Sequence, residues 1–87
     1  MFRQDTRKKV FNLVDKERKL QEQKWSKKIN STAEWMMILG EEYGEACKEG
    51  CNINLAKSKN RSLFIEEVVQ VAAVAFAILE DELEKKE

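Results

Sequence analysis

The stretch VVQVAAVAFAIL, residues 68–79, decides the fold of this 87-residue chain, because every residue in it except Gln70 is apolar. A helix of this sequence, with 3.6 residues per turn, has no ordinary solvent-facing side. Two other helices in so short a chain can hardly cover it all round. We therefore expect a partner for this helix, most simply a second copy of the chain in a helical bundle.

The rest of the sequence is also typical of helices. It has no proline and only three glycines, while Ala, Leu, Glu, Lys and Gln are abundant. The length allows a single domain, residues 1–87. We predict an all-α fold with three main helices per chain, over about residues 3–27, 32–49 and 62–85.

Local signals set these boundaries. Ser31 and Glu34 have the spacing of a capping box, which begins the second helix. Gly50 predicts a left-handed C-cap at its end, and Ser62 predicts an N-cap for the third helix. Residues 51–62 between them are expected to form a loop that holds at most a short helical turn.

Charge is balanced over the chain, with sixteen basic and sixteen acidic residues, so it gives no argument for a nucleic acid polymer or a membrane as partner. It is nevertheless segregated: residues 1–30 carry ten basic and four acidic side chains, and residues 31–87 carry six and twelve. This pattern suits an anionic ligand held through a cation, and it equally suits two halves that pack on each other. Since the chain has no histidine, Glu and Asp are the expected reactive groups.

A cytoplasmic location is expected. The N-terminus is charged rather than apolar, and the apolar run 68–79 is too short by itself to cross a bilayer. Cys47 and Cys51 lie four residues apart, which does not make a zinc site without histidine. We interpret them as small apolar fillers in a reducing compartment.

Two helices carry polar residues on their apolar faces. At about 100° per residue, Glu42 falls in the sector of Trp35, Leu39, Ala46 and Glu49, with Glu45 at its edge. On the third helix Glu67 and Gln70 align with Val74, Ala77 and Asp81.

Burying an unpaired carboxylate costs several kcal/mol, so something should compensate for each one. Ion pairs with Arg18, Lys19 or Lys24 of the basic first helix are one possibility. A divalent cation is the other, since Mg²⁺ prefers oxygen ligands and is commonly held by a few carboxylates together with substrate phosphates. The spacing alone leaves both open.

The motif EEYGE, residues 41–45, followed by EEVVQ, residues 66–70, resembles the MazG-like nucleotide pyrophosphohydrolases. Their signature is Glu-Glu-x-x-Glu and then, after a variable gap, Glu-x-x-Asp. The flanking segments ERKLQEQKWS (17–26), AEWMMILGEEYGEA (33–46) and VVQVAAVAFAILE (68–80) are similar to the corresponding helices. The resemblance covers residues 17 to 83.

This resemblance implies chains that associate, as homo-dimer or homo-tetramer, to complete four-helix cores. It also implies Mg²⁺-dependent hydrolysis of a (d)NTP to (d)NMP and pyrophosphate, with Mn²⁺ as a possible substitute. The implied cation ligands are Glu42, Glu45 and Glu67, with Gln70 at the fourth position. Glu41 and Glu66, the first acids of each doublet, could orient water or pair with a neighbour.

Gln70 departs from the signature, which has Asp at this position. An amide oxygen can still coordinate Mg²⁺, but it brings no negative charge. This difference supports an alternative, a non-catalytic helical homo-oligomeric interaction protein on the same scaffold.

The expected substrate contacts come from the first helix. Trp25 could stack on the base and Gln21 could hydrogen-bond to it, whereas Lys24, Lys27 or Lys28 could contact phosphate as point charges. The competing interpretations are a core or interface aromatic for Trp25 and a solvated face for each lysine.

Overall fold

The structure is a computed structural model of the chain, and it describes residues 3–25, 30–54 and 61–85. Its secondary structure in these ranges is entirely helical, which confirms the all-α prediction. The three helices are α1 (Arg3–Trp25), α2 (Thr32–Asn54) and α3 (Arg61–Glu84). Their order and number agree with those expected from the sequence.

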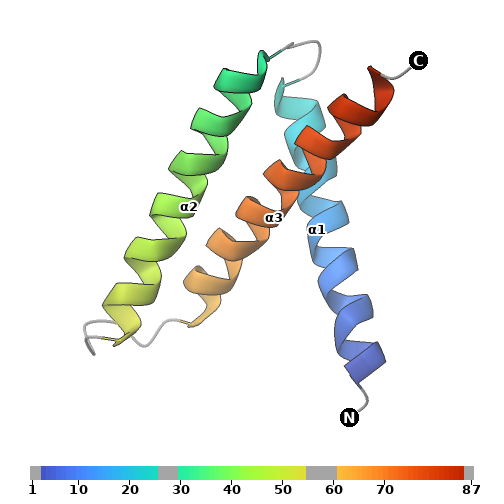
Figure 1. Ribbon diagram of the computed structural model, residues 1–87. Helices are drawn as coiled ribbons and strands as arrows, with labels where there is room; N and C mark the ends of the chain where they lie inside the picture. The colour runs from blue at the N-terminus through green and yellow to red at the C-terminus, as the bar shows by residue number, and fades with distance from the viewer. Residues whose placement is uncertain (1–2, 26–29, 55–60, 86–87) are drawn as a thin grey trace.

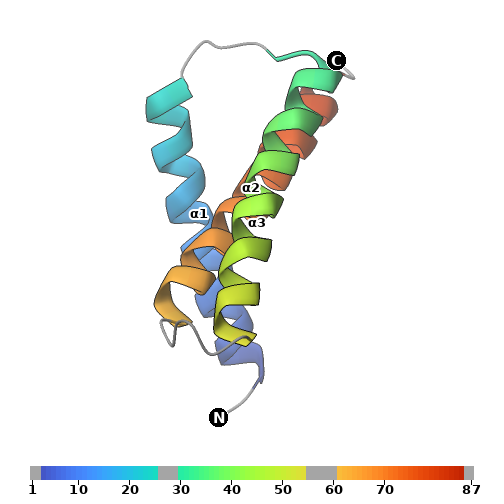
Figure 2. The same ribbon diagram turned by 90° about the vertical axis from the view of Figure 1, so that its left-hand side faces the viewer.

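The apolar helix α3 lies at the centre of the arrangement and packs against both α1 and α2. Figures 1 and 2 show that α2 runs antiparallel to α1 and α3, while α1 crosses α3 obliquely. The C-terminal ends of α1 and α3 and the N-terminal end of α2 lie at the same end of the molecule. The capping box of α2 and the side-chain contacts of Arg18 and Trp35, described below, lie toward this end.

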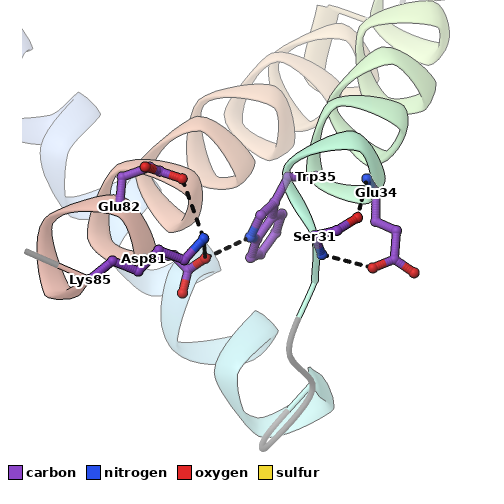
Figure 3. A network of polar contacts seen from close by, with 6 residues as sticks. All are labelled: Ser31, Glu34, Trp35, Asp81, Glu82 and Lys85. Atoms are coloured by element: carbon purple, nitrogen blue, oxygen red, sulfur yellow. Dashed lines mark hydrogen bonds and ion pairs between the residues drawn. The ribbon is translucent and has the colours of Figure 1, made fainter.

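The capping box at the start of α2 is confirmed. The Ser31 amide donates to Glu34 Oε1 at 2.8 Å, and the Glu34 amide donates to Ser31 Oγ at 3.1 Å (Figure 3). Each side chain thereby satisfies a backbone donor that the first helical turn leaves unpaired. The start of α2 is therefore fixed by local sequence.

Two predicted caps are wrong. Gly50 does not end α2, because the helix continues to Asn54. A Cβ atom added at Gly50 would lie 3.4 Å from Cε1 of Phe64, so the missing side chain leaves room for this ring from α3. Ser62 lies inside α3, which begins at Arg61. The part of the expected loop at residues 55–60 lies outside the described residues.

The core is small and lies where the helical projection placed it. Trp35, Val74 and Ala77 are buried against one another. The partly buried side chains that pack on this cluster are Trp25, Ile38, Leu39 and Ile78. On α2 the buried Trp35 and Ala46 share a face with the half-buried Glu42 and Glu49, as expected.

Much of the apolar surface is not covered within one chain. On α3, Phe76 is 40% exposed and Leu79 59% exposed, and on α1 Phe11 is 56% exposed. By length and composition α3 could also cross a membrane, with a mean hydropathy of 1.9 over its most apolar 18 residues. The expectation from the sequence concerned residues 68–79 alone, and α3 extends this run on both sides.

The cysteines also differ from expectation. Cys47 and Cys51 are free thiols, and both are exposed. They lie on the side of α2 that faces away from Trp35 and Ala46, so they do not fill the core.

Candidate functional site: a carboxylate groove between the helices

A groove of about 340 Å³ brings residues of all three helices together. We call it the carboxylate groove; its walls are formed by Glu17, Leu20, Gln21, Lys24, Trp25, Glu42 and Gln70. The groove thus unites the three predicted substrate contacts on α1 with one predicted cation ligand from α2 and one from α3. From the sequence, only residues on the same helix could be predicted to lie on one face.

Glu42 is the electrostatic centre of this groove. Its pKa is raised, first by burial and then by the charges of Glu67, Glu45, Glu17 and Glu41. These five carboxylates come from all three helices, and like charges held together disfavour ionisation of the group. A proton or a cation at Glu42 would relieve the repulsion.

Glu67 on α3 belongs to the same cluster. Its pKa is raised by burial first, followed by the charges of Glu45, Glu49 and Glu66. The facing helices α2 and α3 therefore hold an acidic cluster rather than two isolated pairs.

Ion pairs do not compensate these charges within the part of the chain that the structure describes. Arg18 pairs with Glu80 at 2.7 Å and approaches Glu22 at 3.9 Å. Lys19 pairs with Asp15 at 3.2 Å. Two of the three basic residues expected to neutralise the buried acids are thus engaged elsewhere.

The third candidate, Lys24, lines the groove together with Glu42 but forms no described ion pair with it. No carboxylate of the described residues therefore neutralises Lys24. Lys27 and Lys28 lie outside the described residues.

The donor atoms in and beside the groove suit a hard cation. The carboxylates and the amide oxygen of Gln70 are oxygen ligands, which are the ligands that Mg²⁺ takes. In the described ranges, however, no three acidic or cysteine side chains converge closely enough to hold a metal ion. The ligand set fits Mg²⁺ in chemistry and charge, while its side chains are not gathered into a cage.

The remaining predicted residues occupy the edge of the site. Glu45 is exposed, yet its charge acts on both Glu42 and Glu67. Glu41 is also exposed and lines a smaller hollow of about 210 Å³ with Glu42, Trp25, Asn30 and Ile38. Glu66 is exposed on α3 and lines a shallow cavity beside Gln70.

Glu17 is the residue that sequence reasoning missed as part of the site. It lies in the groove wall and its charge contributes to the raised pKa of Glu42. Its position four residues before Gln21 places both on one side of α1. That spacing was the available signal, but it gave no indication that this side of α1 meets Glu42.

Gln21 and Trp25 also line a larger cavity, of about 410 Å³. We call it the tryptophan cavity, because Trp25 and Trp35, the only tryptophans of the chain, both line it. Its other polar lining residues are two amides and five charged side chains: Gln21, Asn30, Arg18, Glu22, Glu80, Asp81 and Glu84.

Two side-chain contacts between helices border this cavity. Arg18 donates from Nε and Nη2 to the two carboxylate oxygens of Glu80, at 3.0 and 2.7 Å, and so ties α1 to α3. Trp35 Nε1 donates to Asp81 Oδ2 at 3.1 Å and ties α2 to α3 (Figure 3).

Comparison with known proteins gives no match: no family model, no curated protein and no solved structure resembles this chain significantly. The likeness to MazG-like proteins therefore stays a prediction from the motifs at residues 41–45 and 66–70.

Proposed function

We propose that this chain is a Mg²⁺-dependent nucleoside triphosphate pyrophosphohydrolase that hydrolyses a (d)NTP to (d)NMP and pyrophosphate. The observation that carries the proposal is the acidic cluster around Glu42, whose members have no described cationic partner. Such a cluster is unfavourable by itself and becomes favourable when a cation and its polyphosphate ligand bind.

The predicted site residues have separate roles in this proposal. Glu42, Glu45, Glu67 and Gln70 would hold Mg²⁺, or Mn²⁺ in its place. The bound cation would neutralise and orient the polyphosphate and lower the pKa of water bound to it. Glu41 and Glu66, which are exposed at the edge, would orient water or pair with a neighbour.

Helix α1 would supply the contacts to the rest of the substrate. Lys24 is a point charge for phosphate oxygens, and it lies in the same groove as Glu42. The half-buried indole of Trp25 offers a surface on which a base can stack, and the Gln21 amide offers hydrogen bonds. The groove volume of about 340 Å³ lies at the lower end of the usual range for small-molecule sites.

Homo-oligomerisation belongs to the same proposal. The exposed apolar side chains of α3 and α1 need a cover in water, and a second copy of the chain, as dimer or tetramer with four-helix cores, would supply it. Light scattering of the purified protein without detergent tests this. A mass near the 10.2 kDa of one chain, or solubility only in detergent, contradicts it.

The alternative is a non-catalytic helical interaction protein that forms the same homo-oligomers. Two observations favour it: Gln70 brings no charge, and no three acidic side chains in the described ranges converge on one point. It predicts an oligomer without nucleotide turnover.

A nucleotide panel separates the two functions. The wild-type protein is incubated with each (d)NTP and either Mg²⁺ or Mn²⁺, and pyrophosphate release is measured. We expect release that requires the cation and is abolished in Glu42→Ala and Glu45→Ala. Glu82→Ala, which removes a carboxylate that lines none of the cavities described above, is the matched control and should keep full activity.

The enzyme proposal is overturned if no nucleotide is turned over and if Mg²⁺ or Mn²⁺ does not raise the melting temperature. The non-catalytic interaction protein is then the supported function.

A further inference from the structure

We propose that the tryptophan cavity binds an organic polyamine cation. This site goes beyond the proposed function, since the cavity shares only Gln21 and Trp25 with the carboxylate groove and none of the predicted cation ligands lines it. Its volume of about 410 Å³ is within the usual range for small-molecule sites. Three independent features of its lining indicate a cationic ligand.

The first feature is net negative charge. The described lining residues include four carboxylates, those of Glu22, Glu80, Asp81 and Glu84, against the guanidinium of Arg18, and Lys85 brings one ammonium group to Asp81. Arg18 is bound by both oxygens of Glu80 and lies 3.9 Å from Glu22. The acids outnumber these two cations, and Glu22 is 66% exposed, so the described lining attracts cations and repels phosphate groups.

The second feature is the aromatic interior. Trp35 is buried and Trp25 is half-buried, and both line the cavity beneath the acidic rim. An ammonium group over an indole face is attracted by the ring quadrupole, and tryptophan is the strongest such partner among the side chains. The hydrogen bond from Trp35 to Asp81 fixes this indole in position.

The third feature is an acceptor without a donor. Gln21 is only 4% exposed, and its Oε1 is a buried oxygen that accepts no hydrogen bond in the structure described. An unsatisfied buried acceptor is unfavourable. Gln21 itself lines the cavity, so a ligand N–H group that reached Oε1 would supply the missing donor.

The rim already binds an amine of the chain itself. Lys85 Nζ lies 3.4 Å from Asp81 Oδ2, the same oxygen that accepts the Trp35 hydrogen bond (Figure 3). An ammonium group is therefore accommodated beside the indole. A polyamine would bring further ammonium groups to the acids that Lys85 does not reach.

Spermidine is the probe for this site, and the measurement is its binding to the metal-free wild-type protein. Tryptophan fluorescence reports on it directly, because the only two tryptophans line the cavity. Titration calorimetry gives the affinity. All titrations are made at constant ionic strength, with NaCl, MgCl₂ and cytidine as comparison ligands.

A matched pair of variants tests the location. The rim variant, Glu22→Gln with Glu84→Gln, removes one lining carboxylate from α1 and one from α3. The control variant, Asp5→Asn with Glu66→Gln, removes the same charge from exposed positions on the same two helices outside the cavity. We expect the rim variant to bind spermidine roughly tenfold more weakly, because it loses two partly screened charge contacts of a few ångströms each. The control variant should change the affinity for spermidine by less than about twofold.

Equal weakening in both variants would overturn the proposal, because it would show only general electrostatic attraction. A fluorescence change that NaCl or MgCl₂ reproduces would overturn it as well, and so would binding of cytidine without binding of spermidine. Since the assay needs neither Mg²⁺ nor hydrolysis, its failure is distinguishable from failure of the proposed function.

Discussion

The charge of Glu67 on α3 is, after burial, the largest contribution to the raised pKa of Glu42 on α2. Neither residue is near the other in sequence, and each lies on an otherwise apolar helix face. Their repulsion makes the ionised cluster unfavourable in the folded chain. Removing the charge of Glu42 should therefore stabilise the folded chain.

Glu42→Gln should stabilise the metal-free protein at pH 7. The folded pKa of Glu42 lies above the ordinary value of 4.5, so the folded state holds a proton that the unfolded chain releases. The wild-type protein therefore loses stability as pH rises from 4.5 through the folded pKa. We expect a gain of about 2–5 °C at pH 7 from the like-charge pairs removed.

Melting curves from pH 4 to 8 measure this effect as the difference between wild type and variant. The difference should vanish at the acidic end, where Glu42 is protonated. Glu82→Gln is the control and should show no such difference. A variant that is less stable than wild type at pH 7 would show that Glu42 has a cationic partner.

Gln70→Asp should strengthen binding of Mg²⁺, because it adds a carboxylate beside the acidic cluster. In the absence of the cation, the same substitution should lower the melting temperature, since it adds a negative charge beside the other carboxylates. The rise in melting temperature on titration with Mg²⁺ measures both effects. Gln70→Asn is the matched control, because it shortens the side chain equally and adds no charge; equal behaviour of the two variants would separate Gln70 from the cation site.

The paired hydrogen bonds between Arg18 and Glu80 should couple α1 to α3. A double-mutant cycle with Arg18→Met and Glu80→Gln, followed by urea unfolding, should give an interaction of about 0.5–1 kcal/mol. This value allows for the exposure of Glu80, whose side chain is 49% exposed. Arg18→Lys should lose most of it despite the retained charge, because an ammonium cannot bind both oxygens in this geometry. A coupling near zero would show that packing alone holds α1.

Gln21→Met should stabilise the isolated chain by about 1 kcal/mol. It replaces the buried, unpaired Oε1 by an apolar group of similar shape. Urea unfolding checks it, with the exposed Gln23→Met on the same helix as control. A loss of stability in Gln21→Met alone would show that the amide has a partner in solution.

Gly40→Ala should also stabilise the protein, by about 1 kcal/mol, since alanine is the better helix former. No atom lies within 4 Å of a Cβ placed there, and the position is exposed. At Gly50 the same substitution meets the ring of Phe64 at 3.4 Å and should gain less. Destabilisation by Gly40→Ala, measured by thermal unfolding at several protein concentrations, would reveal a partner packed against this face of α2.

The helices themselves could be predicted from local sequence. The capping box of Ser31 and Glu34 formed as its spacing predicts, and the face of α2 that carries Trp35 and Ala46 is the one that packs. Helix ends were predicted less well, because Gly50 satisfies a local C-cap pattern although α2 continues to Asn54.

The sequence by itself determined that this chain is three helices with carboxylates on two apolar faces, because helical periodicity fixes which residues share a side. Only the tertiary structure decided what those carboxylates meet. It brought Glu17 to the cluster, paired Arg18 with Glu80 of α3, and made Trp25 part of the lining of both the carboxylate groove and the tryptophan cavity. These relations depend on the rotation and crossing of whole helices, which the burial of Val74, Ala77 and Trp35 sets and which no local pattern encodes.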